Sequence, residues 1–334
     1  MTFEVLDVGL LTTIQDGGRP GFGHIGVPLG GAADPIGLAV ANIVLGNDPD
    51  AAALEMTIAG PVLAVHRETV VGVGGADLGG VVQPGGRRLE PGAAYRLAAG
   101  STIAFPRLVS GSFGMRCYLA VPGGFDMPVV LGSRSTCLVA GFGGLEGRAL
   151  RTGDVVGAAA DAPGAGTTTA RGVGTVRRNA TGATVAAATV RVFPGPFGGI
   201  DMHALDDLCA AVWTVGRDSD RMGIRLEGPL LQPGRGMVSH GVTWGTIQLP
   251  PGGGPIVLLA DHQPTGGYPV VAVAITADRP ILGQLAPGQQ VRFEVVDVEA
   301  ARAALVAQRK TLDELAVAVS EERRWLDSAG WAGA

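Results

Sequence analysis

Two stretches of the sequence, Gly60-Pro61-Val62-Leu63 and Gly228-Pro229-Leu230-Leu231, repeat one pattern in the two halves of the chain and decide the predicted fold. A polar loop precedes each stretch, at residues 15–21 in the first half and 219–223 in the second. Each half also closes with a turn followed by an apolar strand. Because the order of these features is the same in both halves, the sequence predicts two related β-barrels or sandwiches.

Short apolar runs bounded by Gly and Pro surround this pattern and are typical of strands. Helices are fewer: we expect one after Asp34-Pro35 ending near Leu45-Gly46, one at 201–212 and one at 300–319. The predicted fold is therefore mostly β, with two tandem barrel domains, a few short helices and a C-terminal helix. The expected boundaries are a first barrel at 1–157, an Ala/Gly/Thr-rich linker at 158–188, a second barrel at 189–297 and a C-terminal helix and tail at 298–334.

Composition narrows the possible function. The 334 residues include 55 glycines, which indicates many tight turns, and the net charge is only −5. No dense Lys/Arg run points to nucleic acid, and no long uncharged apolar run points to a membrane. The three cysteines are widely spaced, which argues against a disulfide framework. With no signal peptide recognisable, we expect a cytoplasmic protein.

Lysine is nearly absent, and this excludes several kinds of chemistry. Lys310 is the single lysine, and it lies in a predicted helix. A Walker A loop and a biotinylated lysine are therefore both excluded from this chain. The histidines and cysteines show no metal-ligand spacing, so we expect no metal. Gly72-Val73-Gly74-Gly75 follows a strand but is not followed by a helix, so a turn explains it better than a nucleotide loop.

The first candidate site is the Gly/Pro-rich loop at residues 12–24, which carries Gln15, Asp16, Arg19 and His24. Such a loop lets backbone N–H groups and a guanidinium converge on an anion or an amide. An internal ion pair between Asp16 and Arg19 that fixes the turn explains the pattern equally well.

The second candidate is the stretch 218–227, where Asp220 and Arg221 are among several charges in an apolar protein. A ligand or a structural network would explain these charges. Two further loops carry polar residues: Arg134 lies among hydroxyls at 131–136, and His262, Gln263 and Tyr268 lie between two predicted strands. The latter loop is either a binding loop or an ordinary hairpin connection.

Taken in order, the motifs at 14–21, 131–136, 143–148, 219–223 and 265–269 resemble the family of 5-oxoprolinase C subunits, also called allophanate hydrolase subunit 2 or the biotin-dependent carboxyltransferase family. The resemblance covers about residues 3–297. It implies a pair of cyclophilin-like β-barrels, a partner that resembles the B subunits of these systems and, in some of them, a third, A-type component.

The resemblance also implies chemistry on a small, unreactive amide or lactam. It implies an ATP-dependent amidohydrolase that opens 5-oxoproline to glutamate, with ATP shared with the partner subunit. The site residues would be Asp16, Arg19, Asp220 and Arg221 in catalysis, with Gln15, Arg134, His262, Gln263 and Tyr268 binding substrate.

Two alternatives from other functional classes stay open. One is the carboxyltransferase module of a biotin-dependent urea or amide carboxylase, with biotin on a separate carrier protein. The other is a non-catalytic partner-binding protein of the kinase-inhibitor-antagonist type. The sequence departs from the family pattern at Gly30, His240, His262, Pro264 and Val270. These departures predict an altered substrate or a lost activity.

Overall fold

A computed structural model describes residues 2–160, 187–195, 202–232 and 237–328. Most of the predicted linker at 158–188 therefore lies outside the described residues. By its contacts the chain divides into two compact units. Unit 1 comprises Met1–Gly18, Asp34–Ala180 and Arg309–Ala334, and unit 2 comprises Arg19–Ala33 and Thr181–Gln308. Two segments thus belong to the unit formed mainly by the other half of the chain: Arg19–Ala33 belongs to unit 2, and Arg309–Ala334 belongs to unit 1.

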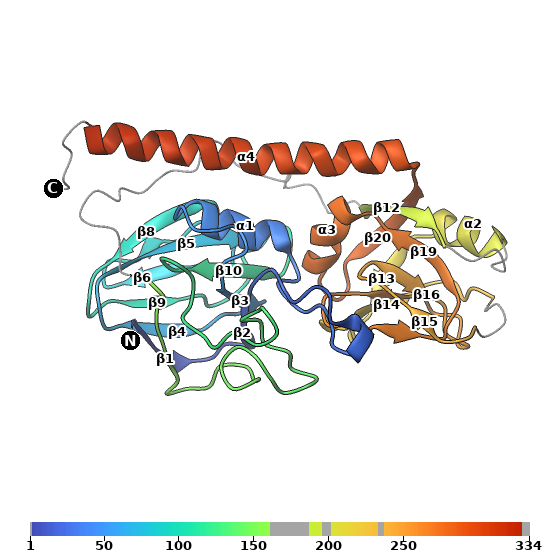
Figure 1. Cartoon of the computed structure of the whole chain (residues 1–334), viewed down its shortest axis with the longest axis horizontal. Coiled ribbons are helices and arrows are strands. Elements are labelled where there is room, and N and C mark those ends of the chain that lie inside the picture. Colours follow the sequence, from blue (N-terminus) through green and yellow to red (C-terminus); the bar gives the residue numbers. More distant parts are fainter. Residues whose placement is uncertain (1, 161–186, 196–201, 233–236, 329–334) are drawn as a thin grey trace. The chain divides into compact units, whose positions relative to one another are not determined.

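Unit 1 is built from two β-sheets (Figure 1). The first has the strand order β11-β1-β4-β9-β6-β7 and the second the order β2-β3-β10-β5-β8. Buried apolar side chains of both sheets, such as Phe3, Leu54 and Leu119, form one core. The strands are β1 (Phe3–Asp7), β2 (Leu11–Gln15), β3 (Ala53–Thr57), β4 (Val62–Val65), β5 (Thr69–Gly75), β6 (Val81–Gln83), β7 (Arg87–Arg88), β8 (Ala93–Leu97), β9 (Thr102–Ala104), β10 (Arg116–Ala120) and β11 (Val155–Val156).

Helix α1 (Pro35–Ile43) lies on strands β5 and β10 of unit 1 (Figure 1). The Asp34 side chain accepts hydrogen bonds from the backbone N–H groups of Ile36 and Gly37, both at 3.0 Å, which confirms the predicted N-cap. Glycines in β5 allow the helix to approach: a Cβ on Gly72 would lie 2.0 Å from the Ala41 carbonyl oxygen, and one on Gly74 would lie 2.1 Å from the Gly37 carbonyl oxygen. The stretch 72–75, which we expected to be a turn, is thus part of a strand, and its glycines let α1 pack closely against it.

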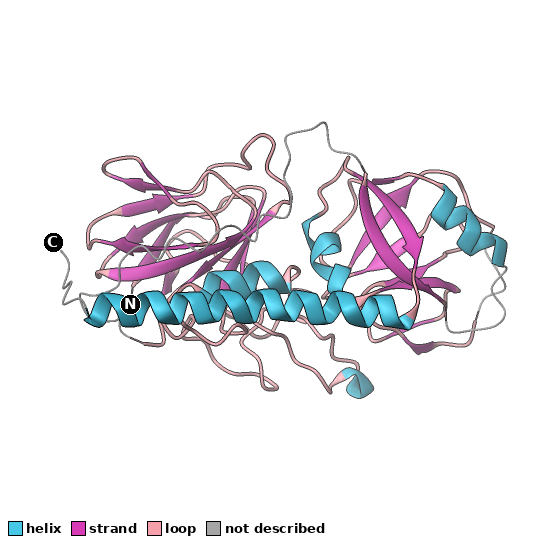
Figure 2. Ribbon diagram, turned by 90° about the horizontal axis from the view of Figure 1, so that it is seen from above, coloured by secondary structure: helices cyan, strands magenta, loops and turns pink. Residues whose placement is uncertain are grey.

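Unit 2 is a closed seven-stranded barrel with the order β12-β19-β16-β17-β14-β13-β20 (Figure 2). Strands β12 and β20 pair in parallel, and the other pairs are antiparallel. A separate two-stranded sheet joins β15 to β18. The strands are β12 (Ala188–Pro194), β13 (Trp213–Val215), β14 (Gly223–Glu227), β15 (His240–Gly241), β16 (Thr246–Gln248), β17 (Ile256–Leu258), β18 (Thr265–Gly266), β19 (Val270–Ala274) and β20 (Gln290–Val295).

The remaining helices are α2 (Met202–Ala210), α3 (Arg279–Gln284) and α4 (Val298–Ser328), with single 3₁₀ turns η1 (Gly23–Ile25) and η2 (Thr276–Asp278). Helices α2 and α4 confirm the predictions at 201–212 and 300–319, although α4 runs further in both directions. Leu315 and Val319 of α4 pack against Ala39, Val40 and Ile43 of α1, within unit 1. The prediction of a mostly β chain with few helices is confirmed.

Candidate functional site

In unit 1, Asp16 is the centre of a hydrogen-bond cluster. Its carboxylate accepts from the hydroxyls of Ser133 and Ser135, from the backbone N–H of Arg134 and from the backbone N–H of Gly18. The Ser133 hydroxyl is 2.6 Å from Oδ1 of Asp16. Four hydrogen-bond donors thus contact this buried carboxylate, and those at 133–135 fix their loop against the end of β2.

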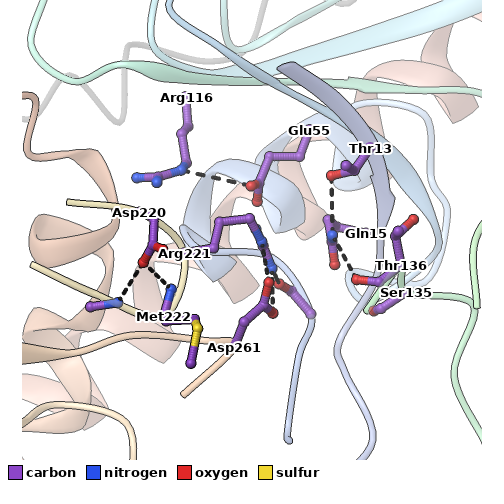
Figure 3. Close-up of polar contacts among 12 residues, drawn as sticks. Thr13, Gln15, Glu55, Arg116, Ser135, Thr136, Asp220, Arg221, Met222 and Asp261 are labelled. Carbon is purple, nitrogen blue, oxygen red and sulfur yellow. Dashed lines mark hydrogen bonds and ion pairs between the residues drawn. The ribbon is translucent and has the colours of Figure 1, made fainter. Parts of the chain in front are cut away.

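Gln15 and Arg134, two other predicted site residues, also make contacts inside unit 1. The Gln15 side-chain NH₂ donates to Thr13 Oγ1 at 3.1 Å and to the Thr136 carbonyl at 3.2 Å (Figure 3). The Nε–H of Arg134 donates to the Met127 carbonyl at 3.0 Å. Within the described part of the chain, Oε1 of Gln15 and Oγ1 of Thr136 have no hydrogen-bond partner, so this corner of unit 1 keeps two buried polar atoms for water or ligand.

In unit 2, Arg221 and Asp261 form a buried, bidentate ion pair (Figure 3). The guanidinium donates Nε–H to Oδ2 at 2.8 Å and Nη2–H to Oδ1 at 3.0 Å. Nη2 also donates to the carbonyl of Gly31 at 2.6 Å. Arg221 therefore ties the Arg19–Ala33 segment to the barrel, and a second tie runs from the N–H of Gly30 to the Ala260 carbonyl at 3.0 Å.

The other predicted residues of unit 2 have different surroundings. Asp220 caps its own turn by accepting from the N–H groups of Met222 and Gly223. The Tyr268 side chain is exposed, and Gln263 is half-buried. Both lie outside the set of residues that line the cavity described next.

Unit 2 contains a cavity of about 480 Å³, a volume typical of small-molecule sites. One wall is the Arg19–Ala33 segment, and the others come from the stretch before β16, from the loop around β18 and from the start of α3. The apolar lining consists chiefly of Val27, Pro28, Leu29, Val242 and Trp244, and the polar lining of Arg19, His24, Thr243, His262, Thr265 and Arg279. None of the described lining residues is acidic.

The charge and hydrogen-bonding state of the cavity follow from Trp244, His262 and Arg279. The Arg279 guanidinium lies over the Trp244 ring, 5.4 Å from its centroid. Burial lowers the pKa of Arg279, yet an arginine stays protonated. Burial also lowers the pKa of His262, and the nearby Arg279 charge lowers it further, against a hydrogen bond to Gln263 that raises it. The imidazole is therefore neutral at pH 7, and its Nδ1–H donates to the Gln263 carbonyl at 2.7 Å.

Two of the five departures from the family pattern line this cavity, and a third lies beside one of its lining residues. His262 and Pro264 line it, and a Cβ on Gly30 would lie 3.0 Å from Nη1 of Arg19, another lining residue. The other two lie elsewhere in unit 2: Val270 is buried in β19, and His240 is in β15. These positions thus relate the departures to the lining of the cavity rather than to the fold.

Comparison with known proteins gives the class of protein. The model of the family "Carboxyltransferase domain, subdomain A and B" matches residues 25–295, and the chain belongs to this family. The chain is 35% identical to the C subunit of 5-oxoprolinase from Escherichia coli, covering 94% of this chain and 97% of that protein. It is 33% identical to the C subunit of 5-oxoprolinase from Haemophilus influenzae, covering 96% and 99%. These relatives confirm the resemblance that the motifs indicated.

A solved structure supports the same relationship. The crystal structure of Kluyveromyces lactis urea carboxylase matches with a TM-score of 0.80 and 28% identity, over 94% of this chain but 29% of that protein. The chain thus corresponds to under a third of that larger enzyme.

Two other features are missing from the described residues. They contain no group of three or more His, Cys, Asp or Glu side chains placed to hold a metal ion. Nor does any of their helices have the length and apolar character needed to cross a bilayer.

Proposed function

We propose that this chain is the C-type subunit of an ATP-dependent 5-oxoprolinase and that it acts with a B-type partner, and in some systems a third component, to open the lactam of 5-oxoproline to glutamate. The observation that carries the proposal is the cavity of unit 2, which combines cationic Arg19 and Arg279 with a neutral His262 in apolar walls. The substrate has matching parts: a carboxylate, an amide group and a small apolar ring. Similarity to the C subunits of two 5-oxoprolinases over nearly the whole of both chains supports it.

The predicted site residues take distinct roles in this proposal. Arg19 and His262 contact the substrate, since both line the cavity. Arg221 is a positioning residue, because its guanidinium is engaged by Asp261 and by the Gly31 carbonyl. We also assign Asp16 a positioning role, because four donors already surround its carboxylate.

The remaining predicted residues have structural or peripheral binding roles in this proposal. Gln15, Arg134 and Asp220 shape their loops through the hydrogen bonds described above. Gln263 and Tyr268 belong to the loop that supplies His262 and are available to a substrate or a partner at its more exposed part.

ATP does not fit the described residues of this chain well. A triphosphate needs several converging donors, commonly a glycine-rich loop before a helix. The glycine-rich stretch here is β5, where Gly72 and Gly74 are closed off by the backbone of α1. We therefore assign nucleotide binding to the B-type partner, and we derive no step through ATP in this chain.

The proposal is tested by reconstitution. The chain is co-expressed with its B-type and A-type partners, the complex is purified, and glutamate release from 5-oxoproline is measured with and without ATP. We expect release only with ATP and only with all required partners. A folded, associated complex that releases no glutamate would reject the proposal.

A second candidate is the carboxyltransferase module of a urea or amide carboxylase. The observation in its favour is the structural match to Kluyveromyces lactis urea carboxylase. Since Lys310, the single lysine, is in α4, biotin would have to arrive on a separate carrier protein. Transfer of labelled carboxylate from a carboxybiotinyl carrier to urea, dependent on this chain, would favour this candidate over the first.

A further inference from the structure

Two buried donors in the cavity of unit 2 lack hydrogen-bond partners among the described residues. They are Nε1–H of Trp244 and Nε–H of Arg279. The Trp244 side chain is 5% exposed and lines the cavity. A buried donor left unsatisfied is costly, so native proteins provide it with a partner, with water or with a ligand. Two such donors at one cavity indicate that the cavity is built to be filled by an acceptor.

The acceptor must carry negative charge. Arg279 forms no ion pair with a described carboxylate, and burial is the only cause that acts on its pKa. Two buried carboxylates of unit 2 are already paired: Asp278 binds Arg191, and Asp261 binds Arg221. Arg279 is partly buried, and a guanidinium removed from water without a counterion is unfavourable, a cost that an anionic ligand removes.

The geometry also limits the shape of the anion. The guanidinium carbon of Arg279 lies over the Trp244 ring, and the Nε–H of Arg279 has no acceptor among the described residues. A guanidinium presents its N–H groups in one plane, as a fork. A planar carboxylate can accept two such N–H groups, or one of them together with the indole N–H. The apolar lining around Val242 and Leu29 leaves room for the rest of a small organic acid.

We infer that Arg279 and Trp244 form a carboxylate-binding subsite and that the cavity selects a small organic acid over an uncharged amide such as urea. The inference deepens the proposed function, on which it rests for the choice of 5-oxoproline as the probe. It assigns a specificity role to two residues outside the polar loops that the sequence singled out.

The test measures binding to the full chain by calorimetry and by ¹⁵N NMR of the indole groups. The four tryptophans give separate indole signals, and the Trp244→Phe variant identifies the signal of Trp244. The probes are 5-oxoproline, 2-pyrrolidinone, which is the same lactam ring without the carboxylate, and urea. We expect 5-oxoproline to shift the Trp244 signal and to bind at least tenfold more tightly than either neutral probe.

Variants separate the subsite from general damage. Arg279→Gln should weaken 5-oxoproline binding about 10- to 100-fold, the loss that follows removal of a charge-assisted hydrogen bond, and should leave 2-pyrrolidinone binding unchanged. Arg292→Gln is the matched control, because it removes one positive charge from an exposed position on β20 of the same unit. It should bind all probes as the wild type does, and circular dichroism checks that each variant is folded.

Several outcomes would overturn the inference: a Trp244 signal that does not move at saturating 5-oxoproline, equal affinity for 5-oxoproline and 2-pyrrolidinone, or equal weakening of both by Arg279→Gln. The first of these would mean that ordered water alone satisfies the two donors. If binding follows the expectation but the reconstituted complex releases no glutamate, the subsite stands and the proposed function fails. If the complex releases glutamate and Arg279→Gln leaves its KM unchanged, the subsite fails and the proposed function stands.

Discussion

The buried pair Arg221–Asp261 allows the stability of unit 2 to be tested quantitatively. Both side chains are at most 5% exposed, and the pair is joined by two hydrogen bonds of 2.8 and 3.0 Å. Arg221→Met leaves the Asp261 carboxylate buried without its cation, which costs about 3–5 kcal/mol. The Gly31 carbonyl also loses its donor. On a total of about 5–15 kcal/mol, this loss is a large fraction of the stability of a domain.

The double variant Arg221→Met/Asp261→Leu separates the two costs. It removes the orphaned charge and keeps only the loss at the Gly31 carbonyl, about 1–3 kcal/mol. We therefore expect the double variant to be more stable than Arg221→Met alone, by about 2 kcal/mol. The stability of Arg221→Lys should lie between those of Arg221→Met and the double variant, because one ammonium cannot reproduce the three hydrogen bonds of the planar guanidinium.

The assay is urea unfolding followed by tryptophan emission, since Trp213 and Trp244 are buried in unit 2. Free energies of unfolding are compared at one pH, together with the affinity for 5-oxoproline as a readout of the Arg19–Ala33 segment. An Arg221→Met cost below about 1 kcal/mol, or a double variant no more stable than the single one, would refute the reasoning.

Three further predictions concern other positions. Gly74→Ala should destabilise the protein by about 1–3 kcal/mol or more in urea unfolding, because its Cβ would meet the α1 backbone, whereas Gly252→Ala, with no atom within 4 Å, should change little. Asp16→Asn should cost about 1.5–3 kcal/mol, since the amide cannot accept from all four donors; an unchanged unfolding midpoint would contradict the hydrogen-bond cluster. The third concerns pH: burial depresses the pKa of folded His262 below its ordinary 6.5, so the unfolded chain takes up a proton first as the pH falls. The free energy of unfolding should therefore decrease as the pH falls from about 7 through the depressed pKa. In His262→Gln this part of the pH dependence should be absent, and identical profiles for the two proteins would contradict it.

The fold was largely predictable because the strands obey local rules. Apolar runs bounded by Gly and Pro lie at β5, β10, β12 and β19 as expected, and the Asp34-Pro35 start of α1 follows from capping chemistry. The pairing of strands and the closure of the barrel in unit 2 depend on contacts between residues far apart in the chain. The periodicity of apolar residues predicts the fold class but not these contacts.

The candidate site was predictable only in part. Arg19 and His262 lie in polar loops, and both line the cavity of unit 2. Trp244 and Arg279 were missed, because neither is in a dense polar stretch: Trp244 precedes β16 in an uncharged stretch, and Arg279 begins α3, a helix of six residues. The sequence did contain one indication, which is a lone arginine: the adjacent Asp278 pairs with Arg191 and leaves Arg279 without that carboxylate. Only the fold reveals that pairing.

The exchange of segments between the halves of the chain has a consequence for dissecting the protein. Arg19–Ala33 belongs to unit 2 but is encoded in the first half, and Arg309–Ala334 belongs to unit 1 but is encoded at the end. A cut in the region between the halves would therefore give two fragments that each lack part of their own unit. Each fragment would also carry a part of the other unit. Neither fragment can therefore be treated as an autonomous domain. The appropriate experiment is complementation, in which the two fragments are produced together and restore the cavity only in each other's presence.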